Sequence, residues 1–295
     1  MPSETALPTS HKIKSQRLNL NYVDWGNADA PNMLLIHGGR DHARNWDWVA
    51  KSLRSDYHIM ALDNRGHGDS DWANTGPYGI DEFVYDVAEL VHQKKLSPLT
   101  IIGHSLGGII SLRYTGLFPE NVVKLVAIEG TGLGRRRYKG DDAAPAPARY
   151  REWVEKMREV TEWDERRYAS IEDALKHMAD ANAHLTPEQA RHMTEHGTKR
   201  NEDGSFSWKF DHYFYSRFIS PFGLDPDETG EIWGNITCPT LLMHGTESWS
   251  TDPAEDGCLD YFNTARSVAV EGAAHWVHLN KLDDFLRLVK EFLAE

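Results

Sequence analysis

Residues 99–107 read Leu-Thr-Ile-Ile-Gly-His-Ser-Leu-Gly, and they decide how the rest of the chain is interpreted. The apolar run 99–102 predicts a buried strand, and the residues from Leu106 onward have helical character. The pentapeptide Gly103-His104-Ser105-Leu106-Gly107 therefore lies at a sharp turn from a strand into a helix. Such a turn exposes the serine hydroxyl, and the flanking glycines let the strained backbone form without a side-chain clash. Ser105 is the candidate nucleophile.

Short apolar runs occur in the first part of the chain, up to residue 128, and again after residue 240. Segments with helical spacing separate several of these runs. This arrangement is typical of a parallel sheet that is covered by helices on both faces. Residues 18–24 instead alternate apolar and polar side chains, which predicts an antiparallel edge hairpin with the preceding strand. We therefore predict an α/β fold with a mostly parallel eight-stranded sheet. The predicted apolar strands are 33–36, 58–62, 99–102, 123–128, 240–243 and 267–270, and the predicted helices include 81–91 and 282–293.

Residues 132–234 differ in composition from the segments on either side. They are rich in charged residues and histidine, show no strand pattern, and have helical spacing at 149–167, 171–182 and 186–197. We predict that this region is an inserted helical cap that covers Ser105. The α/β core is then formed by residues 1–131 and 235–295.

The composition narrows the class of protein. The chain has 295 residues, 40% of them hydrophobic, and a formal net charge of −13, which argues against nucleic acid or an anionic membrane as the main partner. The two cysteines, Cys238 and Cys258, cannot form a disulfide framework, and we expect both to be reduced. No apolar run approaches the length of a membrane span, and the first residues lack the pattern of a secretory signal, so we expect a cytoplasmic location. These features leave the oligomeric state open.

A serine nucleophile needs a base and an oxyanion hole. The predicted base is His275, because it lies in the loop between the last strand and the last helix, at the carboxyl edge of the sheet. His278 follows three residues later, and we assign it a structural role. Gly39 directly follows a predicted strand, so its N–H and that of Leu106 are the predicted donors to an oxyanion.

Four motifs of the chain resemble those of the α/β-hydrolase superfamily, in the order found in that family. They are His37-Gly38-Gly39, Asp63–Ser70, Gly103–Gly107 and Gly272–His275. The resemblance covers nearly the whole chain and is greatest to the capped branch, which includes esterases, epoxide hydrolases, haloalkane dehalogenases and carbon–carbon bond hydrolases. It implies a triad of Ser105, His275 and an acid. It assigns the segment Asp63–Ser70 a structural turn and no catalytic role.

The acid of that triad has more than one candidate. Members of the family often carry it three residues beyond the glycine that follows the penultimate strand, but that position here is Ser248. Glu247 lies one residue earlier. Glu129 follows the apolar strand 123–128, where a buried carboxylate is costly unless it is paired, for instance with a histidine. Some dehalogenase-like members have their acid at a similar place. We favour Glu129, with Glu247 and Asp252 as alternatives.

The residue at the elbow also narrows the reaction. The epoxide hydrolases and dehalogenases of the superfamily use an aspartate there, whereas serine forms an acyl intermediate. We therefore predict a carboxylic ester hydrolase that acts on a small-molecule ester and needs no cofactor. Two alternatives stay open: a carbon–carbon bond hydrolase of vinylogous diketones, and a small-molecule receptor that retains the triad.

One motif in the predicted cap resembles a metal-binding sequence. His192-Met-Thr-Glu195-His196 matches the H-x-x-E-H string of a class of zinc peptidases and places two imidazoles on one helical face. The sequence shows no convincing third ligand. We therefore predict a solvated helix and no metal site.

Overall fold

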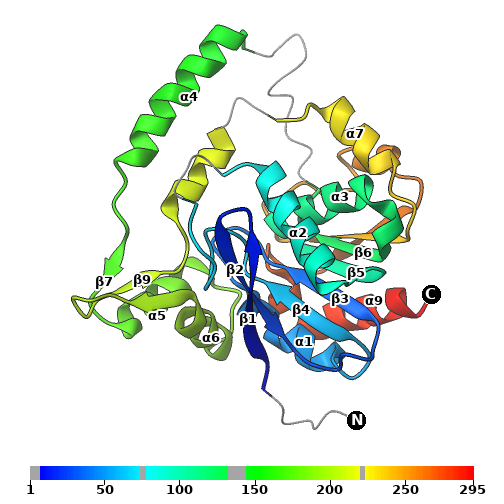
Figure 1. The fold of residues 1–295 in the computed structure, drawn as a ribbon, viewed down its shortest axis with the longest axis horizontal. Helices are drawn as coiled ribbons and strands as arrows, with labels where there is room; N and C mark the ends of the chain where they lie inside the picture. Colours follow the sequence, from blue (N-terminus) through cyan, green and yellow to red (C-terminus); the bar gives the residue numbers. More distant parts are fainter. Residues whose placement is uncertain (1–6, 74–77, 132–143, 220–222) are drawn as a thin grey trace.

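The computed structural model describes residues 7–73, 78–131, 144–219 and 223–295. Its main feature is an eight-stranded sheet in the order β1-β2-β4-β3-β5-β6-β10-β11 (Figure 1). The pairs β1–β2 and β2–β4 are antiparallel, and the remaining pairs are parallel. The predicted mostly parallel sheet and its edge hairpin are therefore confirmed. The strands are β1 (Thr9–Ser15), β2 (Leu18–Asp24), β3 (Asn32–Ile36), β4 (His58–Leu62), β5 (Leu99–His104), β6 (Val122–Ile128), β10 (Thr240–Gly245) and β11 (Ala265–Val270).

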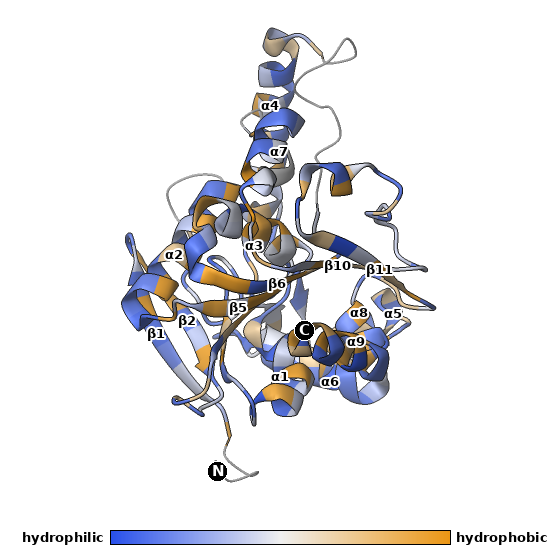
Figure 2. Cartoon of the chain, turned by 90° about the vertical axis from the view of Figure 1, so that its right-hand side faces the viewer, coloured by the Kyte–Doolittle hydropathy of each residue, from blue (hydrophilic) through white to orange (hydrophobic). Residues whose placement is uncertain are grey.

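Helices cover both faces of this sheet (Figure 2). Because side chains alternate along a strand, neighbouring residues such as Ile101 and Ile102 belong to two different apolar clusters. One cluster includes side chains of α2 (Ile80–Lys94) and α3 (Leu106–Leu117), and the other includes side chains of α1 (Asp47–Leu53) and α9 (Leu282–Ala294). A strand that is buried on both faces has no polar alternation, which is why its sequence is a continuous apolar run.

Shorter helices connect these elements. They are η1 (Ala43–Trp46), η2 (Pro119–Asn121), η4 (Cys258–Tyr261) and α8 (Val277–Asn280). Cys238 and Cys258 are both free and buried. Among the described residues, no helix has both the length and the apolar character that crossing a bilayer requires.

Residues 144–219 and 223–234, called here the insertion, lie between β6 and β10 in the chain. Their helices are α4 (Ala146–Thr161), α5 (Ile171–Ala181), α6 (Pro187–Gly197), η3 (His212–Ile219) and α7 (Pro226–Gly234). Helices α5 and α6 begin at capping boxes, in which Ser170 pairs with Asp173 and Thr186 with Gln189. Helix α4 projects away from the sheet in both views.

The insertion also contains a small antiparallel sheet, which the sequence pattern of this region did not predict. The strands are β7 (Arg167–Tyr168), β8 (Thr198–Arg200) and β9 (Phe206–Trp208), in the order β7-β9-β8. Strands of two or three residues are too short to show a polar–apolar alternation in the sequence. Residues 132–143, where the predicted cap begins, lie outside the described part of the chain. The division of the chain into core and cap stays a prediction.

Candidate active site

Ser105 lies between the end of β5 and the start of α3. Its backbone has φ 53° and ψ −114°, a conformation that L-residues rarely adopt, and its N–H donates to the Ile128 carbonyl at 2.7 Å. A Cβ atom on Gly107 would lie 2.1 Å from the Ile36 carbonyl oxygen, so a larger residue does not fit there. The predicted strand–turn–helix at this serine is therefore present, with a glycine where the helix approaches the neighbouring strand.

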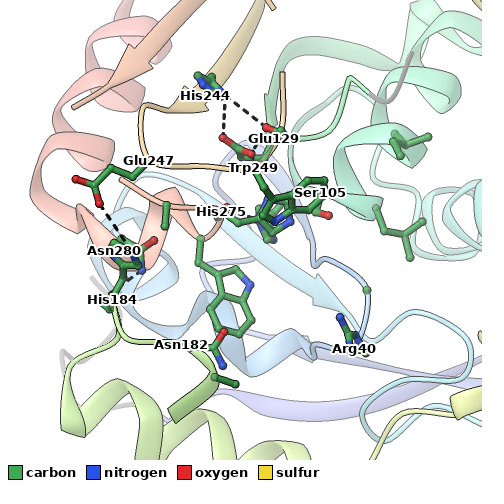
Figure 3. A pocket seen from close by; sticks show the side chains of 18 of the residues that line it. Arg40, Ser105, Glu129, Asn182, His184, His244, Glu247, Trp249, His275 and Asn280 are labelled. Carbon is green, nitrogen blue, oxygen red and sulfur yellow. Dashed lines mark hydrogen bonds and ion pairs between the residues drawn. The ribbon is translucent and has the colours of Figure 1, made fainter. Parts of the chain in front are cut away.

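A pocket of about 1120 Å³ opens over this turn. Ser105, Glu129 and His275 from the sheet edge line it, together with side chains from the insertion such as Asn182. Figure 3 shows these residues around one space, with His275 and Trp249 beside each other. A pocket of this size is large enough for a small organic molecule, and the candidate nucleophile lies in its wall.

His275 lies in the loop between β11 and α8, and its Nδ1 is 3.1 Å from Oε2 of Glu129. A carboxylate accepts hydrogen bonds, so the Nδ1 atom carries the proton and donates it. The other ring nitrogen, Nε2, is then an unprotonated base in the neutral imidazole. The ring packs against Trp249, with the two ring centres 4.7 Å apart.

The Glu129 carboxylate is fully buried and is surrounded by donors. Its backbone has φ 54°, and its N–H donates to the Met243 carbonyl of β10 at 2.8 Å. Its Oε1 accepts from the Gly245 N–H at 2.6 Å, and its Oε2 accepts from the Ser248 hydroxyl at 2.5 Å. The remaining polar groups against it are the Ser250 hydroxyl, His275 Nδ1 and His244 Nδ1, the last at 3.1 Å from Oε1.

These donors determine the charge of Glu129. Burial raises the pKa of its carboxyl group, but hydrogen bonds from His275, Ser248, Ser250 and the Gly245 N–H lower it, and the pKa falls below its usual value of 4.5. The group is thus an anion at neutral pH. It is suited to orienting an imidazole and stabilising its positive charge.

A family model described as the alpha/beta hydrolase fold matches residues 31–282, which is most of the chain. The chain belongs to this family. Among curated relatives, it is 26% identical to Esterase YbfF of Escherichia coli (strain K12), over 89% of this chain and 93% of that protein. It is 25% identical to Epoxide hydrolase 4 of Mus musculus, over 96% of this chain and 79% of that protein.

Solved structures show the same fold. The crystal structure of E-2-(acetamidomethylene)succinate hydrolase superposes with a TM-score of 0.78 at 21% identity, and the match covers 98% of this chain and all of the other. The predicted α/β-hydrolase fold is therefore confirmed.

The other two acids considered for this α/β hydrolase do not contact His275 in any described interaction. The Glu247 side chain is 57% exposed, and its nearest described ion-pair partner is His184 Nε2 at 3.8 Å. Asp252 accepts the Ala254 N–H at 2.8 Å and stabilises a turn. Of the three candidates, the structure brings only Glu129 to His275 within the described residues.

The predicted oxyanion donors lie beside the candidate nucleophile. Gly39 and Leu106 both line the pocket with Ser105. A Cβ atom on Gly38 would lie 3.2 Å from the Ser105 Cβ, which shows how closely the segment after β3 approaches the turn. A Cβ on Gly39 would lie 2.8 Å from the Phe214 ring, so this glycine also makes room for the insertion.

Two buried histidines near the site make contacts that stabilise the surrounding structure. His104 lies directly before Ser105, and its Nε2 donates to the His275 carbonyl at 2.8 Å, which ties the nucleophile turn to the histidine loop. Sequence analysis did not single out this role of His104. His278 is fully buried, stacks on Trp46 and contacts Asn45 Oδ1 through Nε2 at 2.7 Å. Burial lowers the pKa of His278 to about 3, so it is neutral at pH 7.

Proposed function

We propose that this α/β hydrolase cleaves carboxylic esters through an acyl-enzyme intermediate, with Ser105, His275 and Glu129 as its catalytic triad. One observation carries the proposal: in the pocket that Ser105 lines, His275 Nδ1 lies 3.1 Å from the buried Glu129 carboxylate. When Nδ1 donates to Glu129, Nε2 is the ring nitrogen left to act as the base. That is the arrangement by which a serine hydroxyl is activated.

The first half of the reaction forms the acyl-enzyme. The Ser105 oxygen attacks the ester carbonyl carbon while its proton passes to His275 Nε2, and the carbonyl oxygen becomes an oxyanion. The N–H groups of Gly39 and Leu106 are assigned to this oxyanion. The bond between the carbonyl carbon and the alcohol oxygen then breaks, and His275 gives its proton to the departing alcohol.

The second half releases the acid. A water molecule loses a proton to His275 Nε2 and attacks the acyl carbon, forming a second oxyanion in the same place. The bond to the Ser105 oxygen then breaks, and the serine recovers its proton from His275. The overall reaction consumes one ester and one water and yields one acid and one alcohol. Glu129 stays charged throughout and stabilises the imidazolium form of His275.

The relatives include an epoxide hydrolase, so epoxide opening is the competing function. The residue at the turn favours the ester. In the capped α/β hydrolases that open epoxides, the elbow aspartate forms an alkyl ester whose carbonyl carbon water can then attack. A serine at position 105 would instead form an ether with an epoxide carbon, and an ether has no carbonyl for the second step. The likeness to Esterase YbfF also supports the ester.

The test is a substrate panel assayed with the wild-type protein and Ser105→Ala. It comprises p-nitrophenyl esters of increasing acyl length, styrene oxide and a dienol diketone. We expect ester turnover by the wild type and a loss of at least about 10⁴-fold in Ser105→Ala with an unchanged melting temperature. A fluorophosphonate that adds one label per wild-type chain and none to the variant would identify the nucleophile. Turnover of the epoxide or the diketone without the esters would contradict the ester proposal.

A further inference from the structure

A cluster of two histidines and an aspartate lies where α6 of the insertion meets α1 of the core. Asp47, His192 and His196 each offer one ligand atom, and these atoms lie within 4.8 Å of one another. His192 Nε2 is 3.3 Å from Asp47 Oδ2, and the two imidazole rings are 4.5 Å apart between centres. The Asp47 side chain is almost fully buried, and both histidines are half-buried. The cluster is thus a shielded set of nitrogen and oxygen ligands.

We propose that Asp47, His192 and His196 bind a divalent first-row transition-metal ion such as Zn²⁺, with a water molecule as the fourth ligand. Tetrahedral sites of this ion have ligand distances of about 2.1 Å, which places neighbouring ligand atoms about 3.4 Å apart. The pair His192–Asp47 already has this spacing. The remaining separations are no larger than 4.8 Å, so they exceed this spacing by at most about 1.4 Å.

The proposed site differs from the prediction of no metal site made from the H-x-x-E-H string. In this proposal the third ligand is Asp47, at the start of α1 and far from the string in the sequence. Helix α6 is solvated on one face only, because Met193 and Thr194 are each only 1% exposed whereas Arg191 and Glu195 are exposed. Glu195 is exposed and pairs with Arg191 at 3.6 Å, so the glutamate of the string does not belong to the site.

Existing contacts hold α6 against the core. The Met193 carbonyl on α6 lies 3.1 Å from His42 Nε2. His192 Nε2 lies 3.0 Å from the Arg44 carbonyl, and this hydrogen bond is given up when Nε2 loses its proton and binds the ion. On the far side, Gln189 Nε2 donates to the Leu279 carbonyl at 2.9 Å. A metal ion would therefore add a bond between two surfaces that are already in contact, and would fix α6 against the segment that follows Gly39.

Arg44 opposes the ion. Its Nε and Nη2 donate to the Asp47 carboxylate at 2.5–2.9 Å, so a cation at the site experiences a neighbouring positive charge. A carboxylate has about four lone-pair positions, and it can therefore hold an arginine and a metal ion together. If Asp47 is a ligand, we therefore expect removal of the Arg44 charge to tighten metal binding.

The experiment titrates Co²⁺ into the full-length, EDTA-treated protein and follows its visible absorption. We expect one bound ion per chain, displacement by Zn²⁺, and a higher melting temperature with Zn²⁺. His192→Ala and His196→Ala should each weaken binding at least about tenfold, and Arg44→Gln should tighten it about tenfold. His92→Ala, which removes an exposed histidine on α2, is the matched control and should bind as the wild type does.

Two outcomes would overturn the proposal. One is the absence of Co²⁺ binding by the wild type up to about 1 mM, far above the range of a built zinc site. The other is unchanged binding in the His192→Ala/His196→Ala double variant. An affinity that Arg44→Gln does not raise would contradict the role of Asp47 as the third ligand. None of these measurements depends on ester turnover, so they stand apart from the proposed activity.

Discussion

The ends of β6 and β10 are neighbours in the sheet, yet their acidic residues differ completely in environment. The strands pair in parallel, with Ile128 opposite Met243, and each is followed by a glutamate at the same edge. Glu129 is fully buried and contacts His275, whereas Glu247 is 57% exposed and lies 3.8 Å from His184. Placement at the carboxyl edge of the sheet therefore does not by itself select the acid of a triad.

The loop after β10 explains the difference. The Gly245 N–H at the end of β10 and the hydroxyls of Ser248 and Ser250 in the loop after it all donate to Glu129, so this region supplies donors to an acid that directly follows the neighbouring strand. Ser248 stands at the position where the resemblance to the superfamily led us to expect an acid. The two strand ends thus share one task, in which β6 provides the negative charge and the loop after β10 stabilises it.

The largest expected effect comes from exchanging each carboxylate for an amide. Glu129→Gln should reduce kcat for an ester about 10⁴-fold, because the amide no longer stabilises the His275 imidazolium and can hold the wrong tautomer. Glu247→Gln should change kcat by less than about threefold, because it alters only an exposed pair. Steady-state kinetics on one p-nitrophenyl ester measure both. A large loss in Glu247→Gln would reverse the assignment.

The second prediction moves the acid from one strand end to the other. The Ser248 hydroxyl lies 2.5 Å from the Glu129 oxygen that contacts His275, so a carboxylate at position 248 should reach the same imidazole. The double variant Glu129→Gln/Ser248→Asp should regain about tenfold or more of the activity lost in Glu129→Gln.

The control for this exchange is Glu129→Gln/Ser248→Asn, which has the same shape without the charge. Equal activity of the aspartate and asparagine variants would show that the loop after β10 cannot supply a working acid. In that case only an acid at position 129 would have the geometry needed to orient His275.

Much of the candidate site could be proposed from the sequence because its parts depend on local sequence. The apolar run before Ser105, the glycines around it and the loop of His275 each carry their own signal in consecutive residues. No such local signal decides between Glu129 and Glu247. That choice depends on how the loop after β10 folds over the neighbouring strand. The sequence shows only that a carboxylate directly after an apolar strand would be buried and would need a hydrogen-bonding or charged partner.

The insertion was harder to predict than the core, for a physical reason. Strand β7 has two residues and β9 has three, so neither shows a period-two pattern, and their pairing joins segments far apart in the chain. The partner of the His192–His196 pair is likewise distant, since Asp47 lies on the first helix of the core. Helices α5 and α6 were predictable because helical spacing is a local signal in consecutive residues.

A third prediction concerns the donors to Glu129. Ser248→Ala and Ser250→Ala should each lower the free energy of unfolding by about 1–3 kcal/mol, because each leaves a buried carboxylate with one donor fewer. Each should also lower kcat about tenfold, since a less firmly held carboxylate orients His275 less well. Urea unfolding and ester kinetics measure the two effects.

Ser205→Ala is the matched control for these variants. It removes a hydroxyl that donates at 2.6 Å to Asp203, whose side chain is 56% exposed, so water replaces the lost donor. We expect its free energy of unfolding to change by less than about 0.5 kcal/mol. A comparable loss in all three serine variants would mean that burial of Glu129 has no special importance.

The smallest expected effect is the pH dependence of stability, which also separates the two glutamates. The folded state lowers the pKa of Glu129 below 4.5, so its carboxylate stabilises the fold above the unfolded pKa and this stabilisation is lost as pH falls through the folded pKa. Wild type and Glu247→Gln should therefore lose more free energy of unfolding below about pH 5 than Glu129→Gln does. Urea titrations from neutral to acidic pH measure the difference. Parallel curves for wild type and Glu129→Gln would show that the donors around Glu129 do not favour its charged form.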